Sequence, residues 1–209
     1  MGGCPARFMP KSEGSKPAAA EPLPYVSPDS LRGRDQVLYR FLRGEDRDDV
    51  QGRTLDKILL WRDDQLEAVH DYVQWIFPTD EASMFNSQAP LLSPQLQAVC
   101  HQDEKIKENF DRILMRFLSF LGLQMETIEG KQIKISKAEH FETRRRDCWS
   151  AVFGMNHNWL RISRVLHCLG MVGKKEEQRA LMEFLETMPK DIPEVRSSIP
   201  HWRGRAQAS

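Results

Sequence analysis

The segment SPQLQAVCHQDEKIKENFDRILMRFLSFLGL, residues 93–123, decides the fold class of this chain. It starts with Ser93-Pro94, an N-cap residue followed by a proline at the first helical position. Large apolar residues then recur with a period near 3.6, and a break near residues 102–103 can divide the segment. Gly122 supplies the stop, because glycine commonly follows the last turn of a helix. The segment therefore predicts one long helix or two successive helices.

Helical and loop signals alternate through the rest of the chain. Capping residues and apolar periodicity predict further helices at residues 35–44, 64–77, 136–153 and 156–169, and around 181–185. Residues 124–135 fit either a small hairpin or an irregular loop. The predicted fold is an all-α, single compact helical bundle over residues 35–188. A disordered N-terminal segment (1–34) and a disordered, basic, Pro-containing tail (189–209) are expected to flank it.

Charge and cysteine content exclude several classes of function. The 30 basic and 30 acidic residues cancel, so no overall field attracts nucleic acid, and no nucleic-acid partner is expected. The four cysteines form no C-x-x-C pair, which favours reduced thiols in an intracellular protein with no metal or cofactor. No run reaches the ~20 apolar residues of a membrane span. Nucleotide-loop and nucleophile motifs are also absent from the sequence, so no catalytic residues and no enzyme activity are expected.

Four stretches of the sequence resemble a known family. They are HDYVQWIFP (70–78), APLL (89–92), FLGL (120–123) and HNWLRISRVL (157–166). In order and spacing they are similar to the conserved domain of the opioid growth factor receptor family. The last stretch resembles the family's His-Asn-x-Leu-Arg-Ile-Thr-Arg-Ile-Leu. The resemblance covers residues 50–172, nearly all of the predicted folded part.

The resemblance implies a receptor for an enkephalin-type opioid peptide that restrains cell growth. It also implies an intracellular location, in the cytoplasm or in the nucleus with its envelope. No peptide-contacting residue carries over from the family to a position of this sequence. The alternative function is a helical protein–protein interaction or scaffold module that binds no peptide hormone, in which case the partner is a protein.

A first candidate ligand site lies on the helix predicted over residues 66–77. At 100° per residue, Asp71 and Trp75 share the face opposite the apolar arc, Glu67 lies close to them, and His70 lies at the border. A carboxylate beside an aromatic ring suits the N-terminal ammonium of a peptide. These four residues are the predicted ligand-binding set. In the alternative interpretation, another helix of the domain covers Trp75.

A second candidate site is basic. His157, Arg161 and Arg164 follow one another at i, i+4 and i+7, so they form a stripe on one helix face. Arg145 precedes them on a neighbouring predicted helix. Because arginine forks match carboxylates and phosphates, the set predicts a patch for an anionic ligand or partner. The alternative is internal pairing with acidic residues of the domain.

The N-terminal sequence MGGC raises the question of lipid anchoring. Myristoylation of Gly2 and palmitoylation of Cys4 would supply the two lipids that stable peripheral membrane association requires. Pro5 and Ala6 depart from the usual pattern, in which Ser or Thr stands at position 6. An unmodified N-terminus is the alternative.

Overall fold

Residues 93–123 form two helices in the computed structural model, α5 (Pro94–Gln102) and α6 (Glu104–Phe120). Ser93 Oγ accepts the Leu96 N–H (3.1 Å) and Asp103 Oδ1 accepts the Ile106 N–H (3.1 Å), so each helix has its own N-cap. The break predicted at residues 102–103 is therefore confirmed. The apolar stripe of α6 lies in the core; its buried residues include Ile106, Phe110, Ile113, Leu114, Phe117 and Leu118.

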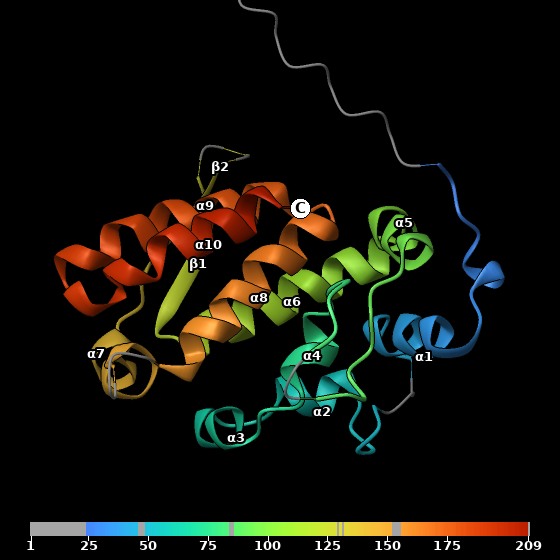
Figure 1. Cartoon of the computed structure of the whole chain (residues 1–209), viewed down its shortest axis with the longest axis horizontal. Helices are drawn as coiled ribbons and strands as arrows, with labels where there is room; N and C mark the ends of the chain where they lie inside the picture. The colour runs from blue at the N-terminus through green and yellow to red at the C-terminus, as the bar shows by residue number, and fades with distance from the viewer. Residues whose placement is uncertain are drawn as a thin grey trace, which may run out of the picture.

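The structure describes residues 24–45, 49–83, 86–128, 130, 132–151 and 156–208. Before α5, these ranges contain a 3-10 turn (Pro28–Ser30) and short helices that lie along the lower side of the view in Figure 1. The helices are α1 (Gly33–Leu42), α2 (Leu55–Leu59), α3 (Asp63–Ala68) and α4 (Val73–Ile76).

The N-terminal boundary of the folded part lies earlier than predicted. Within residues 24–34, which the sequence placed in a disordered segment, Leu31 is buried in the core. Helix α1 begins at Gly33, so Asp35 is not its N-cap. The Asp35 carboxylate instead accepts a hydrogen bond from Ser93 Oγ (2.6 Å), the residue that caps α5. The side chain of Asp35 therefore joins two helices.

The all-α prediction is corrected by one hairpin. Strands β1 (Leu123–Ile128) and β2 (Gln132–Lys137) pair antiparallel, with Leu123 opposite Lys137 and Ile128 opposite Gln132. The fold is thus mostly helical with a small two-stranded sheet, and the hairpin alternative for residues 124–135 holds.

A glycine connects α6 to this hairpin. Gly122 has φ +76°, and a Cβ there would lie 2.8 Å from Phe141 Cα. The helix predicted over residues 136–153 is wrong in its first part, because Ser136 belongs to β2. It is replaced by α7 (Phe141–Arg144) and one π-helical turn (Arg145–Trp149).

The C-terminal third consists of helices that pack on one another. They are α8 (His157–Met171), α9 (Lys175–Thr187) and α10 (Ile199–Gln207), with 3-10 turns at Met188–Lys190 and Pro193–Ser197 between the last two. α9 contacts β2 and α8, and α10 contacts both α8 and α9 (Figure 1). No helix in the described ranges is long and apolar enough to cross a membrane.

The prediction of a disordered C-terminal tail is wrong for the residues described. Trp202 on α10 is completely buried, and its indole N–H donates to the Trp159 carbonyl of α8 (3.0 Å). The three prolines that indicated a tail, Pro189, Pro193 and Pro200, each lie in the first turn of a helical segment. Proline is favoured there because the first turn needs no N–H from it.

Candidate functional site

A pocket of about 720 Å³ opens between α8, α10 and the loop that follows α4. Ligand pockets commonly enclose about 300–1,000 Å³, so this one is large enough for a small molecule or part of a peptide. Its lining includes an unusual number of nitrogen-bearing side chains. These are His70, His157, Arg161, Arg164, His167, His201 and Arg205.

Helix α8 supplies most of that basic character. The helix begins at a local cap, in which Asn156 Oδ1 accepts the Asn158 N–H (2.8 Å). Residues at i, i+3, i+7 and i+10 from its first position share one face and all line the pocket. They are His157, Leu160, Arg164 and His167. The predicted placement of the basic stripe on one helix is therefore confirmed, with Arg161 beside it.

Arg161 is turned into the protein. It is 6% exposed, and its guanidinium donates to the carbonyls of Leu66 (3.0 Å) and Val69 (2.9 Å) and to Asn158 Oδ1 (3.0 Å). These carbonyls lie where α3 ends, and a helix end leaves such groups without partners in the helix. Arg161 therefore has the internal role of the alternative interpretation, although it binds main-chain oxygens rather than carboxylates.

Arg164 has a different environment, although it lies only one turn away. Its Nε donates to the Phe77 carbonyl (2.8 Å), whereas its Nη2 is buried with no hydrogen-bond partner among the described residues. Burial lowers the pKa of Arg164, and Arg205 lowers it further, while Glu81 raises it. Arg164 is thus a cation whose charge the described protein only partly compensates.

His70 and His157, one residue from each candidate site, line the pocket and lie beside each other. The His70 and His157 rings lie with their centroids 5.3 Å apart, and His157 Nε2 is 3.0 Å from Glu67 Oε1. Burial lowers the pKa of His157; Glu67 opposes this shift, and the positive charges of Arg161 and His70 add to it. His157 is therefore held preferentially neutral in the folded chain, even though a carboxylate lies beside it.

This depressed pKa predicts a loss of stability in acid. Because folded His157 takes up a proton less readily than unfolded His157, stability falls as the pH drops below about 6.5, until the pH reaches the folded pKa. The His157→Gln variant should therefore lose less unfolding free energy than wild type between pH 7.5 and pH 5.5, as measured by urea denaturation. His201→Gln, at an exposed position of the same pocket, is the control and should keep the wild-type difference. An unchanged pH dependence in His157→Gln would contradict the assignment.

The geometry predicted for Asp71 and Trp75 is wrong. The expected helix over residues 66–77 is interrupted: α3 ends at Ala68, Val69 is extended, and α4 begins at Val73. The two side chains consequently do not share an exposed helix face. The ligand-binding role assigned to Asp71 and Trp75 therefore has no geometric support.

Both side chains have partners within the domain. Asp71 accepts two hydrogen bonds from Arg53 (2.8 and 3.1 Å). Trp75 is 4% exposed and packs edge-on against Phe41, with ring centroids 5.2 Å apart. Trp75 is thus covered by another helix, as in the alternative interpretation. His70 alone from the predicted peptide site lines the pocket, and Glu67 contacts it through His157.

Arg145 does not line this pocket. It lies at the start of the π-helical turn, 3.3 Å from Glu142, and donates to the Asp191 carbonyl (3.0 Å). Its neighbour Arg144 is the buried arginine of this segment and contacts Asp147 (3.0 Å). The proposed lipidation positions, Gly2 and Cys4, lie outside the described residues.

Most of the other residues that line the pocket were not predicted from the sequence, and two of them come from an unexpected helix. His201 and Arg205 lie on α10, in the segment expected to be a disordered tail. Arg205 pairs with Glu81 of the opposite loop (2.6 Å), so the ion pair closes one side of the pocket. The signal that could have indicated this helix is Trp202, because a tryptophan is seldom exposed in a polar tail.

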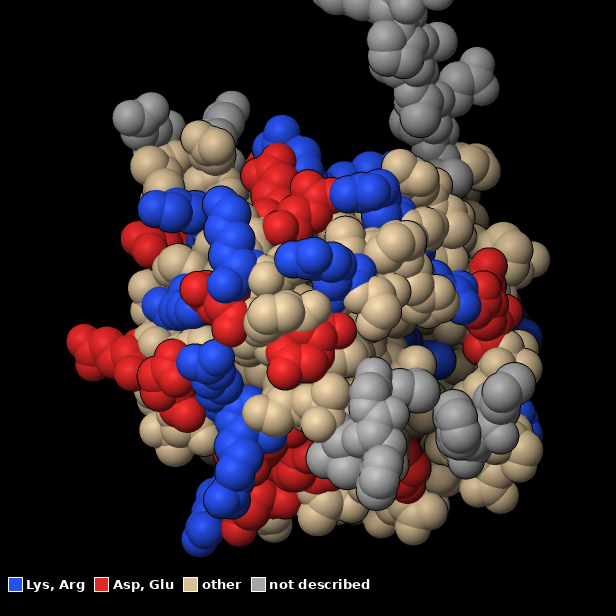
Figure 2. All heavy atoms as spheres, turned by 60° about the vertical axis from the view of Figure 1, so that its left-hand side comes forward, with Lys and Arg blue, Asp and Glu red and all other residues tan. Residues whose placement is uncertain are grey.

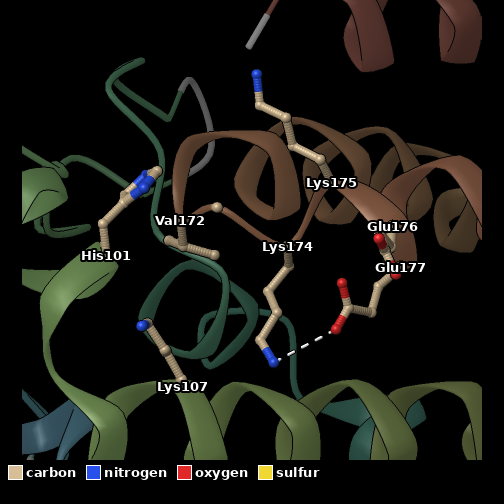
Figure 3. A pocket seen from close by; sticks show the side chains of 8 residues that line it. His101, Lys107, Val172, Lys174, Lys175, Glu176 and Glu177 are labelled. Carbon is tan, nitrogen blue, oxygen red and sulfur yellow. Dashed lines mark ion pairs between the residues drawn. The ribbon is translucent and has the colours of Figure 1, made fainter. Parts of the chain in front are cut away.

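A second, smaller hollow of about 360 Å³ lies where α8 ends and α9 begins, and His101 and Lys107 also line it (Figure 3). Its charges do not converge. Lys174 points toward Glu177 (3.3 Å) and also pairs with Asp111, whereas Lys175 extends in the opposite direction (Figure 3). The Lys174 ammonium is thus neutralised by Asp111 and Glu177. The larger pocket is therefore the better candidate for a ligand site.

Surface charge and potential metal ligands indicate no further candidate site among the described residues. Basic and acidic side chains intermingle over most of the face drawn in Figure 2, and the run of basic side chains at its lower left borders acidic ones. Within the described ranges, no group of three or more His, Cys, Asp or Glu is placed to hold a metal ion. The larger pocket is therefore the candidate functional site.

Comparison with known proteins gives the family. The model of the opioid growth factor receptor (OGFr) conserved region matches residues 33–204. The chain belongs to the opioid growth factor receptor family. The matched range ends inside α10, so the family region includes Trp202 and the last pocket helix apart from Arg205 and its neighbours.

Individual relatives agree with this assignment. The chain is 32% identical to the mouse opioid growth factor receptor over 143 residues, which are 66% of this chain and 22% of the relative. It is 31% identical to the human protein over 165 residues (76% and 23%) and 26% identical to mouse opioid growth factor receptor-like protein 1 over 146 residues (66% and 29%). The chain thus spans about a quarter of the length of these relatives. No solved structure matches it significantly.

Proposed function

We propose that this chain is a ligand-binding domain that takes an opioid peptide of the enkephalin type in the pocket between α8 and α10. The family supplies the class of ligand, since its curated relatives carry the name opioid growth factor receptor. The pocket between α8 and α10 supports the proposed location of the peptide. The main observation behind the proposal is that residues 70–78 and 157–166 both line this pocket. These two stretches carry the family resemblance and are far apart in sequence.

The lining suits a short peptide because it combines charge with apolar surface. Leu160 is 46% exposed and projects among the basic residues of α8, and Val73 and Ala82 also line the pocket. An apolar side chain of a peptide could bury surface against Leu160, while its charged ends meet arginines or Glu81. A peptide site of this kind needs both features, since apolar contact supplies affinity and placed charges fix orientation.

The same proposal assigns binding without catalysis, inside the cell. The described cysteines, Cys100, Cys148 and Cys168, are free and buried, and burial raises the pKa of all three thiols, that of Cys148 and Cys168 to about 12. Such thiols stay protonated and are poor nucleophiles. Unpaired cysteines are typical of the reducing cytoplasm and nucleus, which supports an intracellular site of action.

Calorimetric titration of the full chain with an enkephalin peptide tests the proposal. We expect wild type to bind and Leu160→Glu to raise the dissociation constant at least tenfold, which corresponds to about 1.4 kcal/mol. Leu60→Glu is the matched control, because Leu60 is 83% exposed and does not line the pocket. It should bind like wild type.

Two outcomes would count against the proposal. If wild type releases no heat and shows no binding by a second method, the chain is not an enkephalin receptor, and the alternative of a helical protein-interaction module gains support. If peptide binds but Leu160→Glu and Leu60→Glu behave alike, the peptide site lies elsewhere on the domain.

A further inference from the structure

Arg164 lacks a compensating anion at one end of its guanidinium. No carboxylate of the described residues lies within ion-pair distance of it, and its buried Nη2 has no acceptor. An unpaired buried charge is costly, by several kcal/mol per ion. A protein that retains such a group in the wall of an open pocket gains most from it when an anion enters.

A second buried nitrogen lies on the same side of α8. His167 is three residues after Arg164, so the two side chains are neighbours on the helix surface. His167 Nε2 is 2.9 Å from Asp80 Oδ1, and because a carboxylate only accepts hydrogen bonds, Nε2 carries the proton. The other ring nitrogen, Nδ1, is buried without a partner among the described residues. Asp80 is therefore paired with His167 rather than with Arg164.

The acidic groups around the pocket are already occupied. Glu81, the one carboxylate in its lining, pairs with Arg205, and Asp80 faces His167. Three arginines therefore line the cavity against one paired carboxylate. The site therefore attracts a negatively charged group. Arg164 Nη2 is a hydrogen-bond donor that has no acceptor among the described residues.

We propose that Arg164 binds a carboxylate group of the ligand. This inference rests on the proposed function: for an enkephalin-type peptide, the group is the C-terminal carboxylate. The guanidinium would donate from Nη2 to one carboxylate oxygen. The bound carboxylate supplies the counter-charge that the fold leaves out, so the free C-terminus of the peptide is a determinant of recognition.

A pair of peptides and a pair of variants test this. Calorimetry compares an enkephalin with a free C-terminus and its C-terminal amide on wild type, Arg164→Met and Lys175→Met. We expect the free acid to bind wild type at least tenfold more tightly than the amide, or about 1.4 kcal/mol. The preference should disappear in Arg164→Met. Lys175→Met, which removes a cation that lines the smaller pocket, should keep it.

Thermal unfolding controls for folding of the variant. Methionine fills the volume of the arginine stem and removes a charge that is only partly compensated, but it also removes the donor to the Phe77 carbonyl, so Arg164→Met should melt a few degrees below wild type. Equal binding of acid and amide to wild type would overturn the inference while leaving peptide binding intact.

Failure of both peptides to bind wild type would refute the proposed function, and a second assay then decides the anion site by itself. Acetate and citrate are titrated against the melting temperature of wild type and Arg164→Met. A rise with wild type that the variant lacks would support a carboxylate site at Arg164. Equal shifts, or no shift, would overturn it.

Discussion

The Arg161→Leu variant is expected to lower the free energy of unfolding by about 3–5 kcal/mol. The substitution removes the donor for the carbonyl of half-buried Val69 and the shorter of two hydrogen bonds to the carbonyl of buried Leu66, which keeps only the one from Tyr72 Oη (3.3 Å). Each buried acceptor left without a partner costs about 1–3 kcal/mol. It also removes the donor to Asn158 Oδ1. Urea denaturation monitored by circular dichroism measures the change.

Two further substitutions sharpen this test. Arg161→Lys keeps the charge but cannot fork to several acceptors at once, so its loss should be intermediate. Arg146→Leu is the control, since the Arg146 side chain is 92% exposed, and it should change stability by no more than about 0.5 kcal/mol. Equal effects of Arg161→Leu and Arg146→Leu would show that Arg161 is not an internal clamp.

The second large effect is expected for Trp202→Ala, with a loss of about 3–5 kcal/mol. Trp202 is completely buried, packs edge-on against Trp159 at a centroid distance of 6.5 Å, and donates its indole N–H to the Trp159 carbonyl. Truncation leaves a cavity beneath α10 and removes one of the donors to the Trp159 carbonyl, which keeps the hydrogen bond from Ser163 Oγ (3.0 Å). Because α10 carries His201 and Arg205, the variant should also lose the pocket and bind peptide more weakly.

The neighbouring residue provides the control for Trp202. Arg203 is half exposed and pairs with Glu186 at the surface, so Arg203→Ala should cost at most about 1 kcal/mol. Guanidinium denaturation of both variants makes the comparison. If Trp202→Ala were as stable as Arg203→Ala, the C-terminal segment would not be docked on α8, and the sequence prediction of a disordered tail would be correct.

Sequence predicted the helices whose signals are local. The N-cap side chains of α5 and α6 lie within three residues of the N–H groups they satisfy, and Asn156 caps α8 in the same way. These helices could therefore be predicted from the sequence. The basic stripe of α8 followed directly from the helical period.

Long-range contacts caused the errors. The helix predicted over residues 66–77 is interrupted near Val69, and the carbonyls exposed there are satisfied by Arg161, more than 90 residues later in the chain. No local pattern announces such a partner. The three C-terminal prolines were equally ambiguous, because proline marks both the end of one helix and the first turn of another. Only burial of Trp202 distinguishes the two cases.

The candidate site could likewise be predicted only where its residues share one local element. Three of the lining residues of α8, His157, Arg161 and Arg164, were predicted together because they share one helix. Asp71 and Trp75 were grouped only through a helix that does not form. The remaining pocket residues come from a loop and from α10, which tertiary packing alone brings to α8.

We propose that the basic face of α8 and the docked helix α10 form one ligand pocket. Titration of the ¹⁵N-labelled chain with an enkephalin peptide, followed by amide chemical shifts, tests it most directly. We predict that the shifts concentrate in residues 70–74, 79–83, 157–167 and 201–205 and leave residues around Lys174 unchanged. Saturating shifts confined to other parts of the chain, or no shifts at millimolar peptide, would contradict it.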